Sequence, residues 1–222
     1  GAEPPAAPAA APAPTAPAAP ATPAPAPAAA ADATSSGEGA ATPQDLVTRI
    51  NDFVSSNTTL ETKMQGIMRY TDLSSPEAKQ AIQAQMRLLA AVNKLGDAME
   101  SKFGSKQSPM MNMLTMQMQL PTIDPSLVQQ TSETTAKVPV TNAMSQTEDE
   151  YMIKTDLGWQ IDIAKKIKSS PQMQQGMAML PTIIKAMNTV TKKVLDGSIT
   201  NGMGVDMALG QAMAPGGAPG RP

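Results

Sequence analysis

Residues Ser145 to Lys168 read SQTEDEYMIKTDLGWQIDIAKKIK, and the structural class of the chain depends on this stretch. Its first residues have the spacing of a capping box, in which the side chains of Ser145 and Glu148 satisfy the free amides at a helix start. Apolar residues then recur at helical spacing, and Trp159 and Ile163 add a second apolar face. The recurring positions are Ile153, Leu157, Ile161, Ala164 and Ile167. The pattern predicts one helix that is buried on two sides.

A further helix is expected directly after this stretch. Ser170-Pro171 is a typical helix start, and Gly197 is a typical stop. Apolar residues step by four and three along the segment, which is the spacing of a heptad seam. Pro181 lies inside the seam and should kink or divide the helix at Leu180. We expect this seam to bind neighbouring subunits through Met177, Leu180, Ile184, Met187 and Val194.

The N-terminal half of the chain carries the same kind of signal. Thr42-Pro43 predicts a helix start, a short helix should begin near Thr58, and Ser75-Pro76 should open the longest helix. Gly104 is a natural end for that helix. Its narrow apolar ridge is a second predicted interface with other subunits, made of Leu88, Val92, Leu95 and Met99.

These signals together predict an all-α fold, an elongated helical bundle of coiled-coil-like helices preceded by a disordered arm. Residues 1–41 are rich in Ala and Pro and hold no large apolar side chain, so burial cannot offset their ordering entropy. We interpret them as a tether. The other predicted segments are an N-terminal helical segment (42–104), a Met-rich helix with an irregular connector (105–144), a C-terminal helical segment (145–197) and a flexible Gly/Pro-rich tail (198–222).

The composition excludes several classes of function. The 222 residues include no His and no Cys, so the chain lacks the usual general base, a thiolate nucleophile and the commonest zinc ligands. No glycine-rich phosphate-binding motif occurs. The formal net charge of −2 gives no basic field for nucleic acid. We therefore expect no enzyme activity, no cofactor and no nucleic-acid partner.

Methionine is frequent, with 18 residues, and offers an alternative chemistry. Thioethers are soft ligands that select Cu(I), and several of them stand close together in one segment. Methionine is also a flexible filler at helix contacts, which is the interpretation that we favour. We therefore predict no metal site. The alternative is a periplasmic Cu(I)-binding or chaperone protein that uses Met110, Met113, Met116 and Met118.

The sequence thus predicts a non-enzymatic structural or assembly subunit that acts through helix–helix contacts with other protein subunits. An internal or accessory virion protein and a rod or filament component of a secretion apparatus both fit. A start on Gly1 in place of Met indicates either a removed leader or an added residue. We expect the protein to be exported, to the bacterial periplasm or beyond, or packaged in a virus particle. Contact of the Met-rich segment with a membrane surface is a less favoured alternative.

Overall fold

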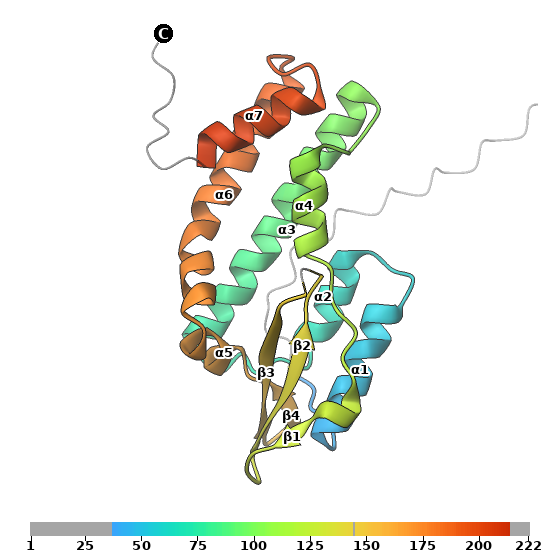
Figure 1. The fold of residues 1–222 in the computed structure, drawn as a ribbon, viewed down its shortest axis with the longest axis vertical. Helices are drawn as coiled ribbons and strands as arrows, with labels where there is room; N and C mark the ends of the chain where they lie inside the picture. The colour runs from blue at the N-terminus through green and yellow to red at the C-terminus, as the bar shows by residue number, and fades with distance from the viewer. Residues whose placement is uncertain (1–36, 144, 214–222) are drawn as a thin grey trace, which may run out of the picture. The chain divides into compact units, whose positions relative to one another are not determined.

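The computed structural model describes residues 37–143 and 145–213. Within these residues the chain combines seven α-helices and one short 3-10 helix with a four-stranded antiparallel sheet (Figure 1). The prediction of an all-α, coiled-coil-like helical bundle is therefore wrong, because the fold is a mixed α/β one. Most of the predicted arm, residues 1–36, lies outside the described residues. No helix in the described part is both long and apolar enough to cross a membrane.

The sheet consists of β1 (Gln129–Gln130), β2 (Thr135–Thr141), β3 (Thr147–Thr155) and β4 (Gly158–Ile161). The strands lie side by side in sequence order, and each neighbouring pair is antiparallel. Successive side chains of a strand point to opposite faces of the sheet. The face that packs on helices therefore carries alternate residues, and four of them are buried: Ala136, Val138, Met152 and Trp159.

The single helix predicted over residues 145–168 does not form, because strand pairing overrides the helical pattern. Asp156 and Leu157 form a two-residue hairpin loop between β3 and β4. Gly158 follows the loop at φ +113°, and a Cβ there would lie 2.6 Å from the carbonyl oxygen of Ala40. Ser145, the predicted cap, has φ 59° in the connection between β2 and β3. Only α5 (Ile163–Ser169) remains helical in this stretch.

Residues 37–41, which we predicted to belong to the tether, are part of the folded domain. The amide of Ala40 donates to the carbonyl of Trp159 over 2.9 Å, and the amide of Trp159 donates back over 2.8 Å. Gly39 lies so close to the backbone of the β3–β4 loop that a Cβ would collide with Leu157 and Gly158. This segment therefore extends the sheet beyond β4.

The first core lies between the sheet and α1 (Pro43–Ser55), with α2 (Leu60–Met68) and the 3-10 helix η1 (Pro125–Leu127) beside α1. The predicted start of α1 is confirmed, because Thr42 Oγ1 accepts a hydrogen bond from the amide of Asp45 over 3.0 Å. The buried side chains of this core include Leu46, Val47, Ile50, Tyr70 and Trp159.

The second core is helical and lies where α3 (Pro76–Phe103), α6 (Pro171–Leu195) and α7 (Gly202–Met213) meet. α3 and α6 run side by side in the same direction (Figure 1). The predicted starts at Ser75 and Ser170 are confirmed, since each hydroxyl accepts a hydrogen bond from the amide three residues on. α6 continues through Pro181 without a break. Residues 202–213, predicted to belong to a flexible tail, form α7 instead.

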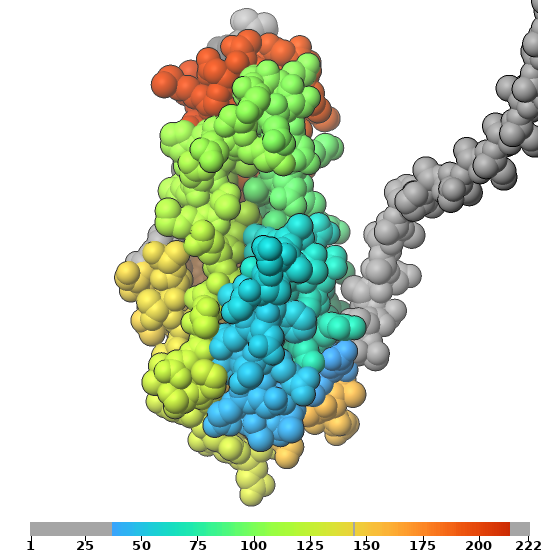
Figure 2. Space-filling model, turned by 90° about the vertical axis from the view of Figure 1, so that its right-hand side faces the viewer, coloured from blue at the N-terminus to red at the C-terminus, as the bar shows by residue number. Residues whose placement is uncertain are grey.

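The start of α4 (Pro109–Gln117) is held by a carboxylate from α7. The Ser108 hydroxyl donates to Asp206 Oδ1 over 2.6 Å, and the amide of Met110 donates to the same oxygen over 3.3 Å. An acidic group at a helix N-terminus is favoured by the helix dipole. Figure 2 shows α7 (red) next to the green helical segments, and the blue and cyan α1 and α2 farther down the same face. We call the contact of the Asp206 carboxylate with Ser108 and Met110 the α4–α7 clasp.

Replacing Gly39 with Ala should lower the free energy of unfolding by about 1–3 kcal/mol, because the new methyl group displaces residues 37–41 from β4. Urea unfolding followed by circular dichroism measures the change. Gly210→Ala in α7 is the matched control. No heavy atom lies within 4 Å of a Cβ there, so this variant should be as stable as the parent or more stable. Equal stability of Gly39→Ala and the parent would contradict the docking of this segment.

Candidate functional site

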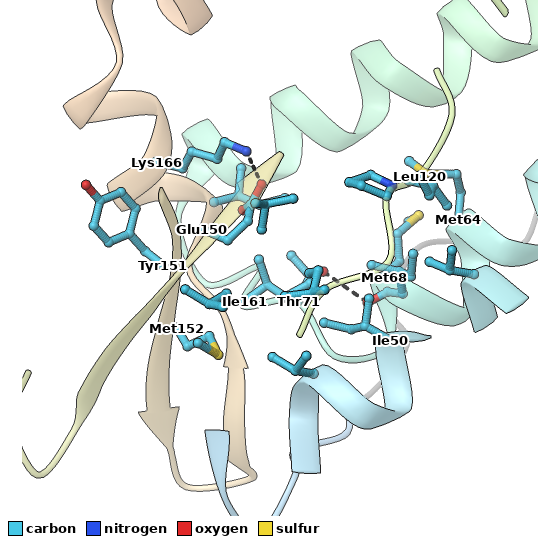
Figure 3. A pocket seen from close by; sticks show the side chains of 18 of the residues that line it. Ile50, Met64, Met68, Thr71, Leu120, Glu150, Tyr151, Met152, Ile161 and Lys166 are labelled. Atoms are coloured by element: carbon cyan, nitrogen blue, oxygen red, sulfur yellow. Dashed lines mark hydrogen bonds and ion pairs between the residues drawn. The ribbon is translucent and has the colours of Figure 1, made fainter. Parts of the chain in front are cut away.

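A cavity of about 190 Å³ lies between the sheet and helices α1, α2 and α5. We call it the sheet cavity, and Figure 3 shows the side chains that point into it from the strands on one side and the helices on the other. Most of these side chains are apolar. Those labelled in the figure include Ile50, Met64, Met68, Leu120, Met152 and Ile161.

One ion pair borders the sheet cavity. Lys166 Nζ of α5 contacts the carboxylate of Glu150 on β3, and it also lies 4.0 Å from Glu148 Oε2. The Lys166 side chain is 16% exposed and that of Glu150 is 26% exposed, so the pair is largely shielded from water. A separate pair joins β2 and β3, in which the Asp149 carboxylate accepts a hydrogen bond from Lys137 and raises the pKa of that amine.

A larger cavity of about 480 Å³ lies among the helices. We call it the helix cavity. Its walls are α2, the middle of α3, the end of α4 with the residues that follow it, and the first half of α6. The polar side chains that line it are those of Gln85, Gln117 and Gln119, and none of the described lining residues is charged. The apolar lining includes Leu60, Leu88, Leu89, Leu114, Met118, Met177, Leu180 and Ile183.

The two cavities adjoin each other. The residues that line both of them are Met64, Gln85, Leu120 and Met173. Among the described residues that line either cavity, only Glu150 and Lys166 are charged. The combined site is therefore a largely apolar space whose two charged side chains both line the sheet cavity. We call it the two-cavity site.

The helix cavity is open because α6 has little to pack against in its first half. All buried residues of α6 lie between Ala186 and Val194, and residues 171–185 are only partly buried or exposed. Gly176 leaves further space, since a Cβ built there meets no atom within 4 Å. A glycine inside a helix costs about 1 kcal/mol relative to alanine, so folding alone does not favour it here.

The structure places the predicted interface residues inside the chain or on the cavity wall. Val92, Leu95, Met99, Met187 and Val194 are buried in the second core, where α3 packs on α6. Leu88, Met177 and Leu180 are partly buried and line the helix cavity. Ile184 is partly buried beside the second core. Contact with other subunits therefore stays a prediction. The buried residues of this set cannot take part in such a contact in this fold.

The four methionines of the Cu(I) alternative do not share one environment. Met110 and Met118 pack against the second core, whereas Met113 and Met116 are exposed at 49% and 46%. Within the described residues, no group of three or more Asp, Glu, His or Cys side chains could hold a metal ion. The thioether site stays an alternative that no contact in the described residues tests.

Sequence reasoning missed the two-cavity site. In the predicted helix Glu148 belongs to a capping box and Glu150 has no role, but both lie on β3, two residues apart, and therefore on the face that meets Lys166. The signal available in the sequence was the β-favouring residues Tyr151, Ile153 and Thr155 directly before the turn residues Asp156 and Gly158. The cavity walls come from six helices and three strands of the described part, and no local sequence pattern brings these elements together.

Comparisons of this chain with protein-family models, curated proteins and solved structures found no match.

Replacing Lys166 with Met should lower the free energy of unfolding by about 1–2 kcal/mol. The change leaves the Glu150 carboxylate shielded from water without its counter-charge. Because both groups keep some contact with solvent, the loss should be smaller than for a fully buried pair. The double variant Lys166→Met/Glu150→Leu should regain most of the stability. Urea unfolding of the parent, both single variants and the double variant measures the coupling, and additive effects would contradict the ion pair.

Proposed function

We propose that this chain is a non-enzymatic binding protein for a small amphiphile. The alkyl chain of the ligand lies in the two-cavity site, and its polar head lies at the Glu150–Lys166 pair. The observation that carries the proposal is the adjoining pair of largely apolar cavities with a single ion pair that lines the sheet cavity. A ligand whose polarity is confined to one end matches this distribution of lining groups.

The size of the site supports a small molecule over a partner helix. Small-molecule sites have volumes of about 300–1,000 Å³, and the helix cavity, at about 480 Å³, lies in that range. An α-helix with its side chains is about 10–12 Å wide. Because α2, α3, α4 and α6 already surround the helix cavity, we expect it to be too narrow for a further helix. An alkyl chain is narrow enough to pass between their side chains.

The lining chemistry supports an unbranched or variable chain. Met64, Met118, Met173 and Met177 supply flexible thioether side chains, which adapt to ligands of different shape. Polar groups that would recognise a ring or a hydrogen-bonding pattern are few in the helix cavity. The proposal therefore concerns the class of ligand and assigns no reaction.

The assembly role predicted from the sequence remains a second candidate. It is supported by apolar side chains that the described fold leaves exposed on α7, where Met203 and Met207 are 75% and 61% exposed. Such exposure on one helix is typical of a contact surface. Binding of an amphiphile and assembly with protein subunits do not exclude each other.

Replacing Gly176 with Leu tests the proposed site directly. The new side chain should fill part of the helix cavity without a clash, and the gain in helix propensity should keep the protein stable. Titration of the parent with 1-anilinonaphthalene-8-sulfonate, followed by displacement with hexadecanoate and with hexadecanol, measures binding. We expect the variant to bind these probes at least tenfold more weakly, which corresponds to about 1.4 kcal/mol.

Gly210→Leu is the matched control, because Gly210 also lies in a helix with no atom within 4 Å of a Cβ, but it does not line either cavity. This variant should bind the probes as the parent does. Displacement by hexadecanoate but not by hexadecanol would assign the head to an anionic group. Equal affinity of the two leucine variants, or no binding by the parent, would overturn the proposed function.

A further inference from the structure

A groove lies along the contact between α3 and α6, and its lining residues differ in chemistry from those of the two-cavity site. It has a volume of about 530 Å³. Its apolar lining residues are Ala84, Pro181 and Ile184, which we call its apolar floor, and the neutral polar residues Asn188 and Thr189 line it as well. We call it the α3–α6 groove. None of its lining residues lines the sheet cavity or the helix cavity. The groove is therefore a separate surface.

Three basic side chains stand along this groove without acidic partners. Arg87 of α3 and Lys185 and Lys192 of α6 form no ion pair with any residue that the structure describes. No Asp or Glu is among the described residues that line the groove. Five basic residues elsewhere in the described part contact a carboxylate, namely Arg49, Arg69, Lys106, Lys137 and Lys166, whereas several others, such as Lys154 and Lys168, form no ion pair. What sets the groove apart is that three such cations line one concave surface with no carboxylate among its described lining residues. The groove thus carries uncompensated positive charge.

The cations recur at heptad spacing on both walls. Lys185 and Lys192 are seven residues apart on α6. On α3, Lys94 is exposed and stands seven residues after Arg87, so it lies on the same helix face. Because α3 and α6 run in the same direction (Figure 1), the two rows are parallel and flank an apolar floor. In coiled coils, charged residues flank the apolar seam in this way and pair with opposite charges of the partner helix.

We propose that the α3–α6 groove binds an acidic amphipathic helix of a partner protein. Apolar residues of the partner helix contact Ala84, Pro181 and Ile184, and its Glu or Asp side chains pair with Arg87, Lys185 and Lys192. Lys94 extends the contact by one heptad. The concave apolar floor favours a helix over a flat anionic membrane, which would meet the cations but leave the floor uncovered. The partner is identified by charge complementarity and by the repeat of seven residues.

The test uses the full chain and a synthetic probe. The probe is a fluorescein-labelled peptide of three heptads with Leu at positions a and d and Glu at positions e and g; a second peptide has Lys in place of Glu. Fluorescence anisotropy should show binding of the Glu peptide in the micromolar range and at least tenfold weaker binding of the Lys peptide. Affinity for the Glu peptide should fall between 0.15 M and 0.5 M salt, because the ion pairs are exposed. Equal binding of the two peptides would overturn the proposal.

Charge reversal localises the binding. Lys185→Glu/Lys192→Glu should weaken binding of the Glu peptide at least tenfold. Lys154→Glu/Lys168→Glu is the matched control, because it changes the net charge equally at exposed residues outside the groove. This control should bind within about twofold of the parent. Equal losses in both double variants would reduce the effect to net charge and overturn the proposal.

Two further arms complete the experiment. Vesicles of phosphatidylcholine with phosphatidylserine, and duplex DNA, should not compete with the Glu peptide at equal charge concentration. Competition by either would overturn the proposal of a helical partner, because the groove would then bind anionic surfaces in general. Gly176→Leu should bind the Glu peptide as the parent does. The proposal for the α3–α6 groove and the proposed function of the two-cavity site can therefore be overturned independently of each other.

Discussion

The four residues of β4 hold the sheet and the helices α1 and α2 together, since both edges of this strand are hydrogen-bonded. β4 pairs with β3 on one side. On its other side Trp159 exchanges two hydrogen bonds with Ala40, and the amide of Ile161 donates to the carbonyl of Tyr70 over 2.8 Å. The segments before α1 and after α2 are thereby fixed to the same strand. This arrangement covers an edge that would otherwise be open to further pairing, and it sets the distance between α1, α2 and the sheet.

The cavities follow from the composition of the chain. With two Phe, two Tyr and one Trp, few side chains are large enough to fill the space between two layers. Trp159 and Tyr70 are buried in the first core, which leaves the first half of α6 with Met, Gln and Gly. Protein interiors are normally packed without such gaps. The helix cavity thus lies where aromatic residues are absent from the lining and where methionine can change its conformation.

Local signals predicted the helices well, and long-range pairing explains the failures. Hydroxyl caps at Thr42, Ser75 and Ser170 are determined by a few neighbouring residues, so their positions could be predicted from the sequence. The stretch from Ser145 to Lys168 satisfied a helical pattern as well, but β3 obtains its hydrogen bonds from β2 and β4. The helical periodicity of apolar residues does not reflect the stability that these inter-strand hydrogen bonds add.

The candidate site could not be predicted for the same reason. Leu88 and Met177 were identified as apolar seam residues, and they are indeed inward-facing, but which space they face depends on α2 and α4. The pairing of Glu150 with Lys166 depends on β3 being a strand. The apolar helix face on which Leu88 and Met177 lie could therefore be predicted from the sequence. The residues on the opposite wall of the cavity could not.

The α4–α7 clasp gives the order in which the fold can be completed. Ser108 and Asp206 are 98 positions apart, so α4 is synthesised long before the carboxylate that holds its first turn. Contacts of such large sequence separation form late, because the intervening chain must first be ordered. The wall that α4 provides to the helix cavity therefore depends on a contact between residues that are far apart in the sequence. Residues of α7 thus help to set one wall of a cavity that α7 itself does not line, because the Asp206 carboxylate accepts hydrogen bonds from the first turn of α4.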